Sequence, residues 1–219
     1  MIPLQLALRR RMMMAGGGGA PISDLPLGAL INIGTDGGAG APNYEIADKD
    51  NLVSGGVVLV RKIVHSKSAF GFALYSKSTL DTKMTSIYNS YPETLKSKVM
   101  DATFKLYNSA GEEIVTRKVF ALSYTMVGGG DLEGIVEGHA LQLYNSDVSR
   151  VKNTVDGNAT HWWLSSRLSR EESFCIRSAG YISQDYPGQS FGVVPAFVIP
   201  SDTLYSATPN TDGSYNLIL

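Results

Sequence analysis

Two apolar segments in the last third of the chain limit its fold more than any other feature. Residues 160–167 (THWWLSSR) contain both tryptophans of the chain, and residues 190–201 (SFGVVPAFVIPS) form an apolar run bracketed by prolines. Together they supply much of the apolar surface that a core of this size can bury. Adjacent strand residues point to opposite faces, so we expect one of the two tryptophans in the core. The other expected core residues are Phe120, Val194 and Phe197.

The chain is long enough to form a substantial core as a single domain. It has 219 residues, of which 23 are glycine and 11 tyrosine, and its charged content of 18% is below the usual quarter. This composition is typical of a loop-rich protein that contains β-strands. The net charge of -1 and the isoelectric point of about 6.3 argue against nucleic acid as the main partner.

The residue types that usually bind metals do not occur in the usual spacing. Cys175 is the only cysteine, which excludes disulfides within the chain and predicts an inert structural thiol. The three histidines lie far apart, and the acidic stretch between residues 132 and 158 lacks the spacing of a calcium loop. The candidate oxygen ligands that gather in that stretch are Glu133, Glu137, Asp147, Asp156 and Asn158. We therefore expect a solvated loop, no metal and no cofactor.

The first residues differ in character from the rest of the chain. Residues 2–14 (IPLQLALRRRMMM) are apolar with a basic centre, and a run of four glycines follows them. The basic residues come after the apolar ones, so we do not expect a secretion signal. We expect an anchoring arm (1–15), a flexible linker (16–21) and one domain (22–219). The residues that we expect to anchor the arm in a larger assembly are Leu4, Leu8, Arg9, Arg10, Arg11 and Met12.

Periodicity and turn residues predict strands and two short helices in the first half. Strands are expected over residues 29–33, 44–47 and 57–64, the last two as a hairpin. The glycine-rich stretch 36–42 between them lacks both phosphate-binding signatures and is predicted to be a loop. Apolar residues at helical spacing predict a helix from Ser78 or Thr79, and Pro92 begins a second one.

The second half is predicted to be mostly strands. A hairpin is expected over residues 103–107 and 113–124, and another over 174–182. Residues 132–158 show little periodicity and are predicted to form a long irregular region. Residues 192–199 are expected to close the sheet, and the tail 216–219 is expected to be an edge strand or a docking peptide. No apolar run reaches the length of a membrane span.

Several separated blocks of the sequence resemble one family. The blocks WWLSSR, CIRSAGYI and FGVVPAFVIPSD are similar, in order, to the WWLRSP…V…G…GVRPAF signature of an uncharacterised domain family of Firmicutes and their phages. The segment RKVFALSY (117–124) is similar to the KVFLLS strand of that family. The resemblance implies an α+β fold, a single C-type-lectin-like domain with an antiparallel sheet and two short helices. Related enzymes of that fold class use paired cysteines, which this chain lacks.

These observations favour a binding protein over an enzyme, because no nucleophile signature is present. We expect a non-enzymatic structural protein of a phage virion, assembled in the host cytoplasm and oligomeric in the particle. Its arm would contact other virion proteins, and its domain a host-surface glycan or a neighbouring subunit. Tail or baseplate is the expected position; capsid decoration, head fibre and an enzyme acting on the host surface are the alternatives. The residues predicted to bind are Tyr144, Trp162, Arg167, Arg170, Tyr181, Tyr186 and Gln189.

Overall fold

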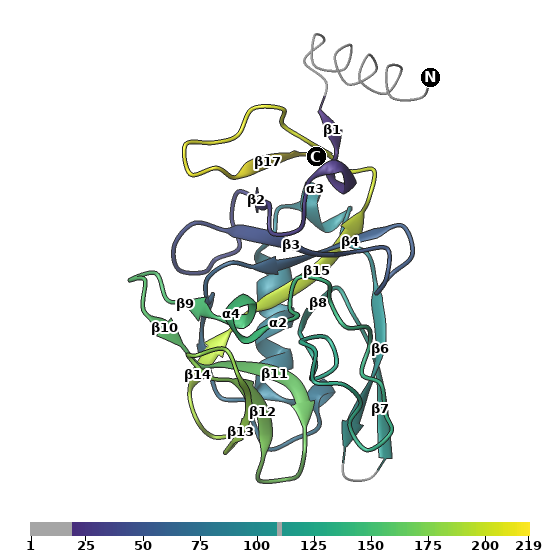
Figure 1. Cartoon of the computed structure of the whole chain (residues 1–219), viewed down its shortest axis with the longest axis vertical. Coiled ribbons are helices and arrows are strands. Elements are labelled where there is room, and N and C mark those ends of the chain that lie inside the picture. Colours follow the sequence, from purple (N-terminus) through teal and green to yellow (C-terminus); the bar gives the residue numbers. More distant parts are fainter. Residues whose placement is uncertain (1–18, 109–110) are drawn as a thin grey trace.

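The computed structural model describes residues 19–108 and 111–219, and these are folded mainly into β-strands (Figure 1). The expected arm (1–15) and the first residues of the expected linker lie outside the described residues. The last two linker residues form the strand β1 (Ala20–Pro21), which pairs with β16 (Leu204–Tyr205).

The expected α+β, C-type-lectin-like fold is wrong. The described residues contain seventeen strands, and their helices are the twelve-residue α2 and two four-residue helices, α3 and α4. Many strands are only two to four residues long, too short to show a period of two in the sequence. The sequence pattern therefore did not predict these short strands.

The largest sheet has eight strands in the order β1-β16-β17-β2-β3-β4-β15-β8. All neighbours are antiparallel except β17 and β2. The strands not yet given are β2 (Leu30–Asn32), β3 (Asn43–Lys49), β4 (Gly56–Arg61), β8 (Val119–Ala121), β15 (Pro195–Pro200) and β17 (Tyr215–Ile218). The predicted hairpin of β3 and β4 is confirmed.

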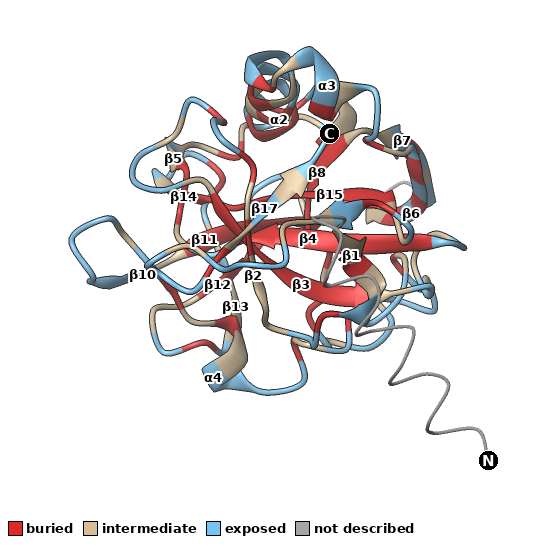
Figure 2. Ribbon diagram, turned by 90° about the horizontal axis from the view of Figure 1, so that it is seen from above, coloured by how far each residue is buried: buried red, intermediate tan, exposed pale blue. Residues whose placement is uncertain are grey.

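The centre of this sheet is formed by β3, β4 and β15, whose ribbons are almost wholly buried in Figure 2. The run Val57–Val60 of β4 is buried at every position, and since successive side chains point to opposite faces, both faces of the sheet are covered here. Pro195 begins β15, a position that requires no ladder hydrogen bond from its nitrogen. Residues 192–199 were expected to close the sheet. They instead split between two sheets, and β15 lies inside the larger one.

A second sheet of five strands has the order β13-β12-β11-β14-β5. Its strands are β5 (Ser66–Ser68), β11 (Trp162–Arg167), β12 (Ser173–Ile176), β13 (Ile182–Asp185) and β14 (Phe191–Val193). The predicted β12–β13 hairpin is confirmed. Gly192 allows β14 to lie between β11 and β5, since a Cβ there would be 2.5 Å from Val64 Cγ1 and 3.0 Å from the His161 carbonyl.

Two hairpins and the helices complete the fold. The hairpin β6 (Ala102–Asn108) and β7 (Gly111–Arg117) alternates buried and exposed residues along β6. A smaller hairpin joins β9 (Lys152–Asn153) and β10 (Ala159–Thr160). The helices are α2 (Thr79–Ser90), α3 (Glu93–Lys96) and α4 (Asp147–Arg150), with 3-10 turns η1 (Ile22–Asp24) and η2 (Tyr75–Lys77). Ser78 caps α2 as predicted, its hydroxyl accepting from Asp81 N at 3.0 Å.

One hydrophobic core runs through the described residues. The predicted core residues Phe120, Val194 and Phe197 are all fully buried in it. Trp162 and Trp163 are both fully buried, although they point to opposite faces of β11, because each face of this strand is covered. Each indole nitrogen also donates a hydrogen bond, Trp162 to the Arg150 carbonyl and Trp163 to the Ser68 carbonyl.

Candidate binding surface

Two aromatic side chains are exposed side by side at one end of the five-stranded sheet. Phe72 and Tyr186 each have 52% of their surface exposed, and their ring centroids are 5.3 Å apart in an edge-to-face arrangement. Large aromatic side chains usually bury most of their surface, so an exposed pair in mutual contact is unusual on a folded surface. We call this pair and the acidic hollow beside it the aromatic–acidic surface.

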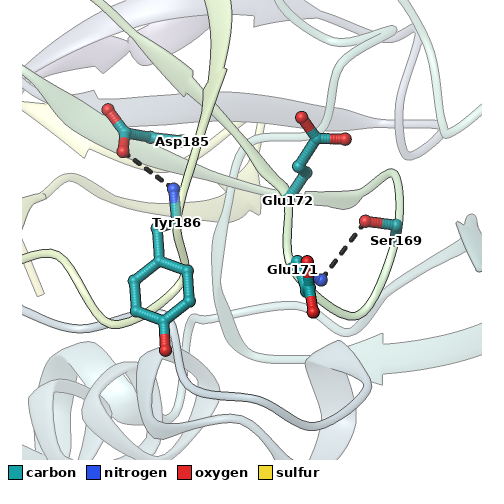
Figure 3. Close-up of a pocket in the computed structure, with 5 residues that line it drawn as sticks. All are labelled: Ser169, Glu171, Glu172, Asp185 and Tyr186. Carbon is teal, nitrogen blue, oxygen red and sulfur yellow. Dashed lines mark hydrogen bonds between the residues drawn. The ribbon is translucent and has the colours of Figure 1, made fainter.

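The acidic hollow is an open depression of about 530 Å³ (Figure 3). The side chains that line it are Ser169, Glu171, Glu172, Asp185 and Tyr186. Asp185 is bound by Arg177 at 2.8 Å, whereas Glu171 and Glu172 have no ion pair with another described residue. The hollow is therefore negatively charged beside an exposed aromatic ring.

Strand pairing holds the parts of this surface together. Ser173 of β12 pairs with Arg167 of β11 and with Asp185 of β13, so the turn after β11 and the loop after β13 lie at the same end of the sheet. The Gly71 amide donates to the Pro187 carbonyl at 3.1 Å and brings the loop that carries Phe72 against the loop that carries Tyr186. The aromatic pair is therefore built on a fixed framework.

The structure separates the seven residues that we predicted to bind. Arg170, Tyr186 and Gln189 are exposed in the two loops at the aromatic–acidic surface. Tyr181 is 51% exposed but lies in the turn at the other end of the β12–β13 hairpin. Tyr144, Trp162 and Arg167 are buried. The predicted anchor residues Leu4, Leu8, Arg9, Arg10, Arg11 and Met12 lie outside the described residues.

The three buried residues stabilise the framework. Arg167 donates from Nε to the Ser169 carbonyl at 2.5 Å and from Nη2 to the Arg170 carbonyl at 2.6 Å, which fixes the turn after β11. Tyr144 donates from its hydroxyl to Glu45 Oε1 at 2.7 Å inside the core. Arg167 thus supports the aromatic–acidic surface from behind without being part of it.

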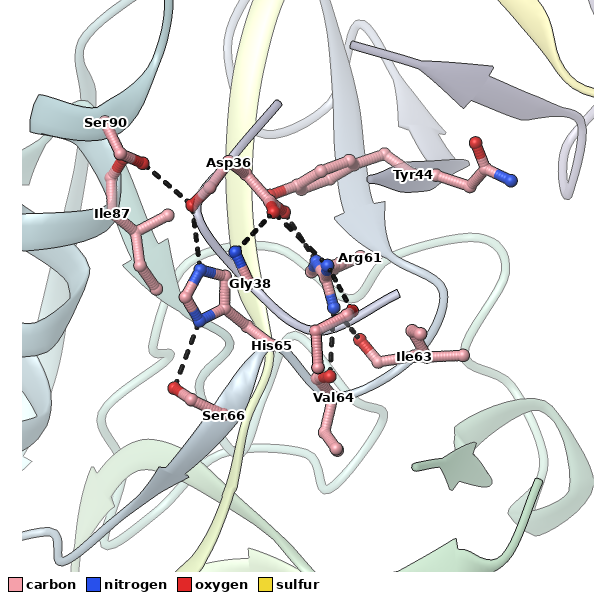
Figure 4. Close-up of polar contacts among 12 residues, drawn as sticks. Asp36, Gly38, Tyr44, Arg61, Ile63, Val64, His65, Ser66, Ile87 and Ser90 are labelled. Atoms are coloured by element: carbon pink, nitrogen blue, oxygen red, sulfur yellow. Dashed lines mark hydrogen bonds and ion pairs between the residues drawn. The ribbon is translucent and has the colours of Figure 1, made fainter. Parts of the chain in front are cut away.

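A buried ion pair fixes the predicted glycine-rich loop, residues 36–42 (Figure 4). Arg61 Nε donates to Asp36 Oδ2 at 2.5 Å, and both side chains are almost fully buried. Asp36 also accepts from the Tyr44 hydroxyl and the Gly38 amide, each at 3.0 Å. Burial raises the pKa of Asp36, but the hydrogen bond and charge of Arg61 outweigh it and hold the pKa below its usual value.

His65 lies against the same loop as a neutral ring. Its Nε2 is 2.8 Å from the Asp36 carbonyl oxygen, which can only accept, so Nε2 carries the hydrogen and Nδ1 accepts from the Ser66 hydroxyl at 3.0 Å. Burial lowers the pKa of His65 and outweighs the opposing effect of Asp36. The Asp36 carboxylate is bound by Arg61, not by the imidazole, so these residues anchor a loop.

The carboxylates of Glu45 and Glu137 are also buried. Glu45 forms ion pairs with Lys152 and Lys62 and accepts a hydrogen bond from the Tyr144 hydroxyl. Burial raises the pKa of Glu45, but the charges of Lys152 and Lys62 outweigh burial and hold the pKa below its usual value. Glu137 is fully buried and accepts from the Tyr107 amide at 2.7 Å and from the Ser166 hydroxyl. Burial raises the pKa of Glu137. The prediction that it lies in a solvated loop is wrong, since it connects β6 to β11.

A second hollow, of about 230 Å³, lies between α2 and the strands β7 and β8. Its two cationic residues are already paired, Arg117 with Asp81 and Lys118 with Asp101. Within the described ranges, no three His, Cys, Asp or Glu side chains are grouped so that they could hold a metal ion. No helix in that part of the chain is long and apolar enough to cross a membrane.

Reasoning from the sequence missed Phe72 and both glutamates of the hollow. Phe72 stands in a glycine-containing stretch (FGF, 70–72) with no periodicity, so nothing marked it as exposed. Glu171 and Glu172 directly follow Arg170, and an acidic pair in a turn is usually a solvated feature. The contact between the loops of Phe72 and Tyr186, more than a hundred residues apart, has no local signal.

Neither the curated proteins nor the solved structures include a match to this chain. A family model does match, over residues 54–201, from the turn before β4 to the end of β15. The matched range includes the whole five-stranded sheet and every residue of the aromatic–acidic surface. It leaves out β1, β2, β3, β16 and β17. Because this match covers more than half of the chain, the protein belongs to the DUF6273 family, described as a domain of unknown function.

Proposed function

We propose that this protein is a non-catalytic component of a bacteriophage particle, at the tail or baseplate, and that its aromatic–acidic surface binds a host-surface glycan. The observation that carries the binding proposal is the exposed contact of Phe72 with Tyr186 beside Glu171 and Glu172, which form no ion pair with any residue that the structure describes. The virion setting is supported by the resemblance of the Trp162 and Phe197 blocks to a family found in phages and by the apolar, basic arm.

The chemistry of this surface suits a saccharide. Aromatic faces stack on the apolar faces of sugar rings, and carboxylate oxygens accept hydrogen bonds from hydroxyl groups or pair with amino groups. Ring atoms of Phe72 and Tyr186 also lie close to Gly188, which has no side chain to cover the pair. An open hollow of about 530 Å³ gives access to a ring within a longer chain.

Purified protein binding to host cells and to isolated cell-wall polysaccharide tests the proposal. The double variant Phe72→Ala with Tyr186→Ala should bind at least about tenfold more weakly, a loss of about 1.4 kcal/mol. Tyr181→Ala is the matched control, because it removes an equally exposed tyrosine from the other end of the same hairpin. It should bind as the wild type does.

Two results would contradict the glycan proposal. Wild-type protein that binds neither cells nor polysaccharide, yet is retained by a particle protein through Phe72 and Tyr186, would make the surface a contact between subunits. Equal losses in the Tyr181→Ala control and the double variant would show that the aromatic–acidic surface has no special role.

A further inference from the structure

The edge of the large sheet that carries β1 is built from chain outside the family match. The first and last described segments meet there, through β1 with β16 and β17 with β2. Three apolar side chains are exposed along this edge, Leu204 by 38%, Ile218 by 46% and Leu219 by 42%. Figure 1 shows β1 and β17 at one end of the molecule and β12, β13 and β7 at the other. The apolar edge is therefore distinct from the aromatic–acidic surface.

The residues before β1 enter the described structure on this apolar edge. A Cβ built on Gly19 would lie 2.5 Å from Ile218 Cδ1 and 3.2 Å from Leu204 Cβ. The arm that precedes Gly19 contains Leu4, Leu6 and Leu8 and three methionines, a set of side chains that water solvates poorly. The apolar segment therefore precedes, in the sequence, a glycine that lies against the exposed apolar edge.

The charges of the two parts are also complementary. The Ile22 amide donates to the Thr203 carbonyl at 2.8 Å and the Ser23 amide to the Ser201 carbonyl at 3.2 Å, which brings the segments of Asp24 and Asp202 together. Both carboxylates are exposed, and neither has an ion pair with another described residue. The arm carries its basic residues at positions 9–11, directly after the leucines.

The direction of β1 decides which copy the arm fits. β1 runs from Ala20 towards Asp24, so the described chain enters β1 at the end away from the acidic pair. To reach the acids of its own copy, the arm would have to reverse within the glycine run. When two edges meet about a twofold axis they run antiparallel, and each arm then leaves towards the acids of the other copy. The nine Cα-to-Cα steps from Arg11 to Ala20 can span at most ~30 Å.

We propose that two copies of this chain exchange their N-terminal arms. The leucines of each arm cover Leu204, Ile218 and Leu219 of the second copy, and Arg9 to Arg11 pair with its Asp24 and Asp202. Pro21 removes a ladder donor from β1, so the contact is made by side chains rather than by extending the sheet. The interface is the same on both copies and closes on itself. This proposal is independent of what the aromatic–acidic surface binds.

A charge-swap experiment on the full chain tests the exchange. Variant A carries Arg9→Glu, Arg10→Glu and Arg11→Glu; variant B carries Asp24→Lys and Asp202→Lys. Wild type should have the mass of a dimer by light scattering after size exclusion, and A and B alone the mass of a monomer. An equimolar mixture of A and B should regain the dimer mass, because each acidic arm meets a basic edge and each basic arm an acidic one.

The control is Glu171→Lys with Glu172→Lys, an equal charge reversal in the acidic hollow, which should remain dimeric. If variant B does not fold by circular dichroism, Ile218→Ser replaces it and should be monomeric alone. A monomeric wild type would overturn the proposal, and so would a control that dissociates. An A and B mixture that stays monomeric would also overturn it, since arms that fold back on their own copy gain nothing from mixing.

Discussion

At the scale of single residues, His65 makes the stability of the protein depend on pH. Its pKa in the folded protein is below the ordinary 6.5 because burial disfavours the charged ring. As pH falls through 6.5 the unfolded chain takes up a proton on this residue and the folded chain does not. The stability contribution is therefore complete above pH 6.5 and is lost progressively below it.

Replacing His65 by Gln should remove this slope, because an amide can still donate to the Asp36 carbonyl but does not titrate. We expect the unfolding midpoint of the wild type to fall more steeply than that of His65→Gln as pH is lowered between about 8 and 5. His139 is exposed, so His139→Gln serves as control and should retain the wild-type slope. Identical slopes for all three proteins would show that His65 titrates normally.

Phe197 tests the packing of the core. It is fully buried, with ring centroids 5.0 Å from Tyr44 and 5.4 Å from Tyr91. Phe197→Ala should lower the free energy of unfolding by about 3 to 5 kcal/mol, since it leaves a cavity that these rings cannot fill. Ile114 is 64% exposed, and Ile114→Ala should change that free energy by less than about 0.5 kcal/mol. Chemical denaturation of both variants measures the difference.

At the scale of elements, Glu137 connects the β6–β7 hairpin to β11. Its pKa is raised above the ordinary 4.5 by burial, so above pH 4.5 the unfolded chain releases a proton that the folded chain still holds. Stability therefore falls as pH rises from 4.5 to the folded pKa. Glu137→Gln lacks this loss, and its unfolding midpoint relative to wild type should rise over that window. Glu133→Gln, at an exposed position, should show no such trend.

The sequence predicted correctly those elements whose structure is determined by neighbouring residues of the same segment. The valine run of β4, the Ser78 cap of α2 and the turn between β12 and β13 all appear where expected. Long-range contacts could not be predicted in this way. The loop before Tyr44 depends on Arg61, twenty-five positions from Asp36, and the aromatic pair depends on loops that meet only in the folded chain.

At the scale of the whole molecule, the described residues form one hydrophobic core. Deleting residues 2–15 should therefore leave a folded protein with a single cooperative unfolding transition at nearly the wild-type temperature, measured at low protein concentration. The deletion should give a protein with the mass of a monomer, because the exchanged arms are the proposed contact between the two copies. Loss of the folded state would show that the arm belongs to the core, and a truncated protein that stays dimeric would place the contact between copies elsewhere.

The prediction of an α+β, lectin-like fold was wrong because of how the whole chain is arranged. The sequence blocks around Trp162 and Phe197 led to the expectation of one antiparallel sheet with lectin-like order. In the structure these blocks lie in two different sheets, because β14 and β15 follow each other but pair with β11 and β4 respectively. Only Val194 separates the two strands. It is an apolar residue like its neighbours, so nothing in the sequence marks it as the point where the chain passes from one sheet to the other.

Adsorption of assembled phage particles is the most direct test of the central claim. Particles that carry Phe72→Ala and Tyr186→Ala should contain the protein in normal amount but adsorb to host cells at least about tenfold less than wild-type particles. Particles that carry Tyr181→Ala should adsorb normally. Normal adsorption by the double variant, or absence of the protein from purified particles, would contradict the account.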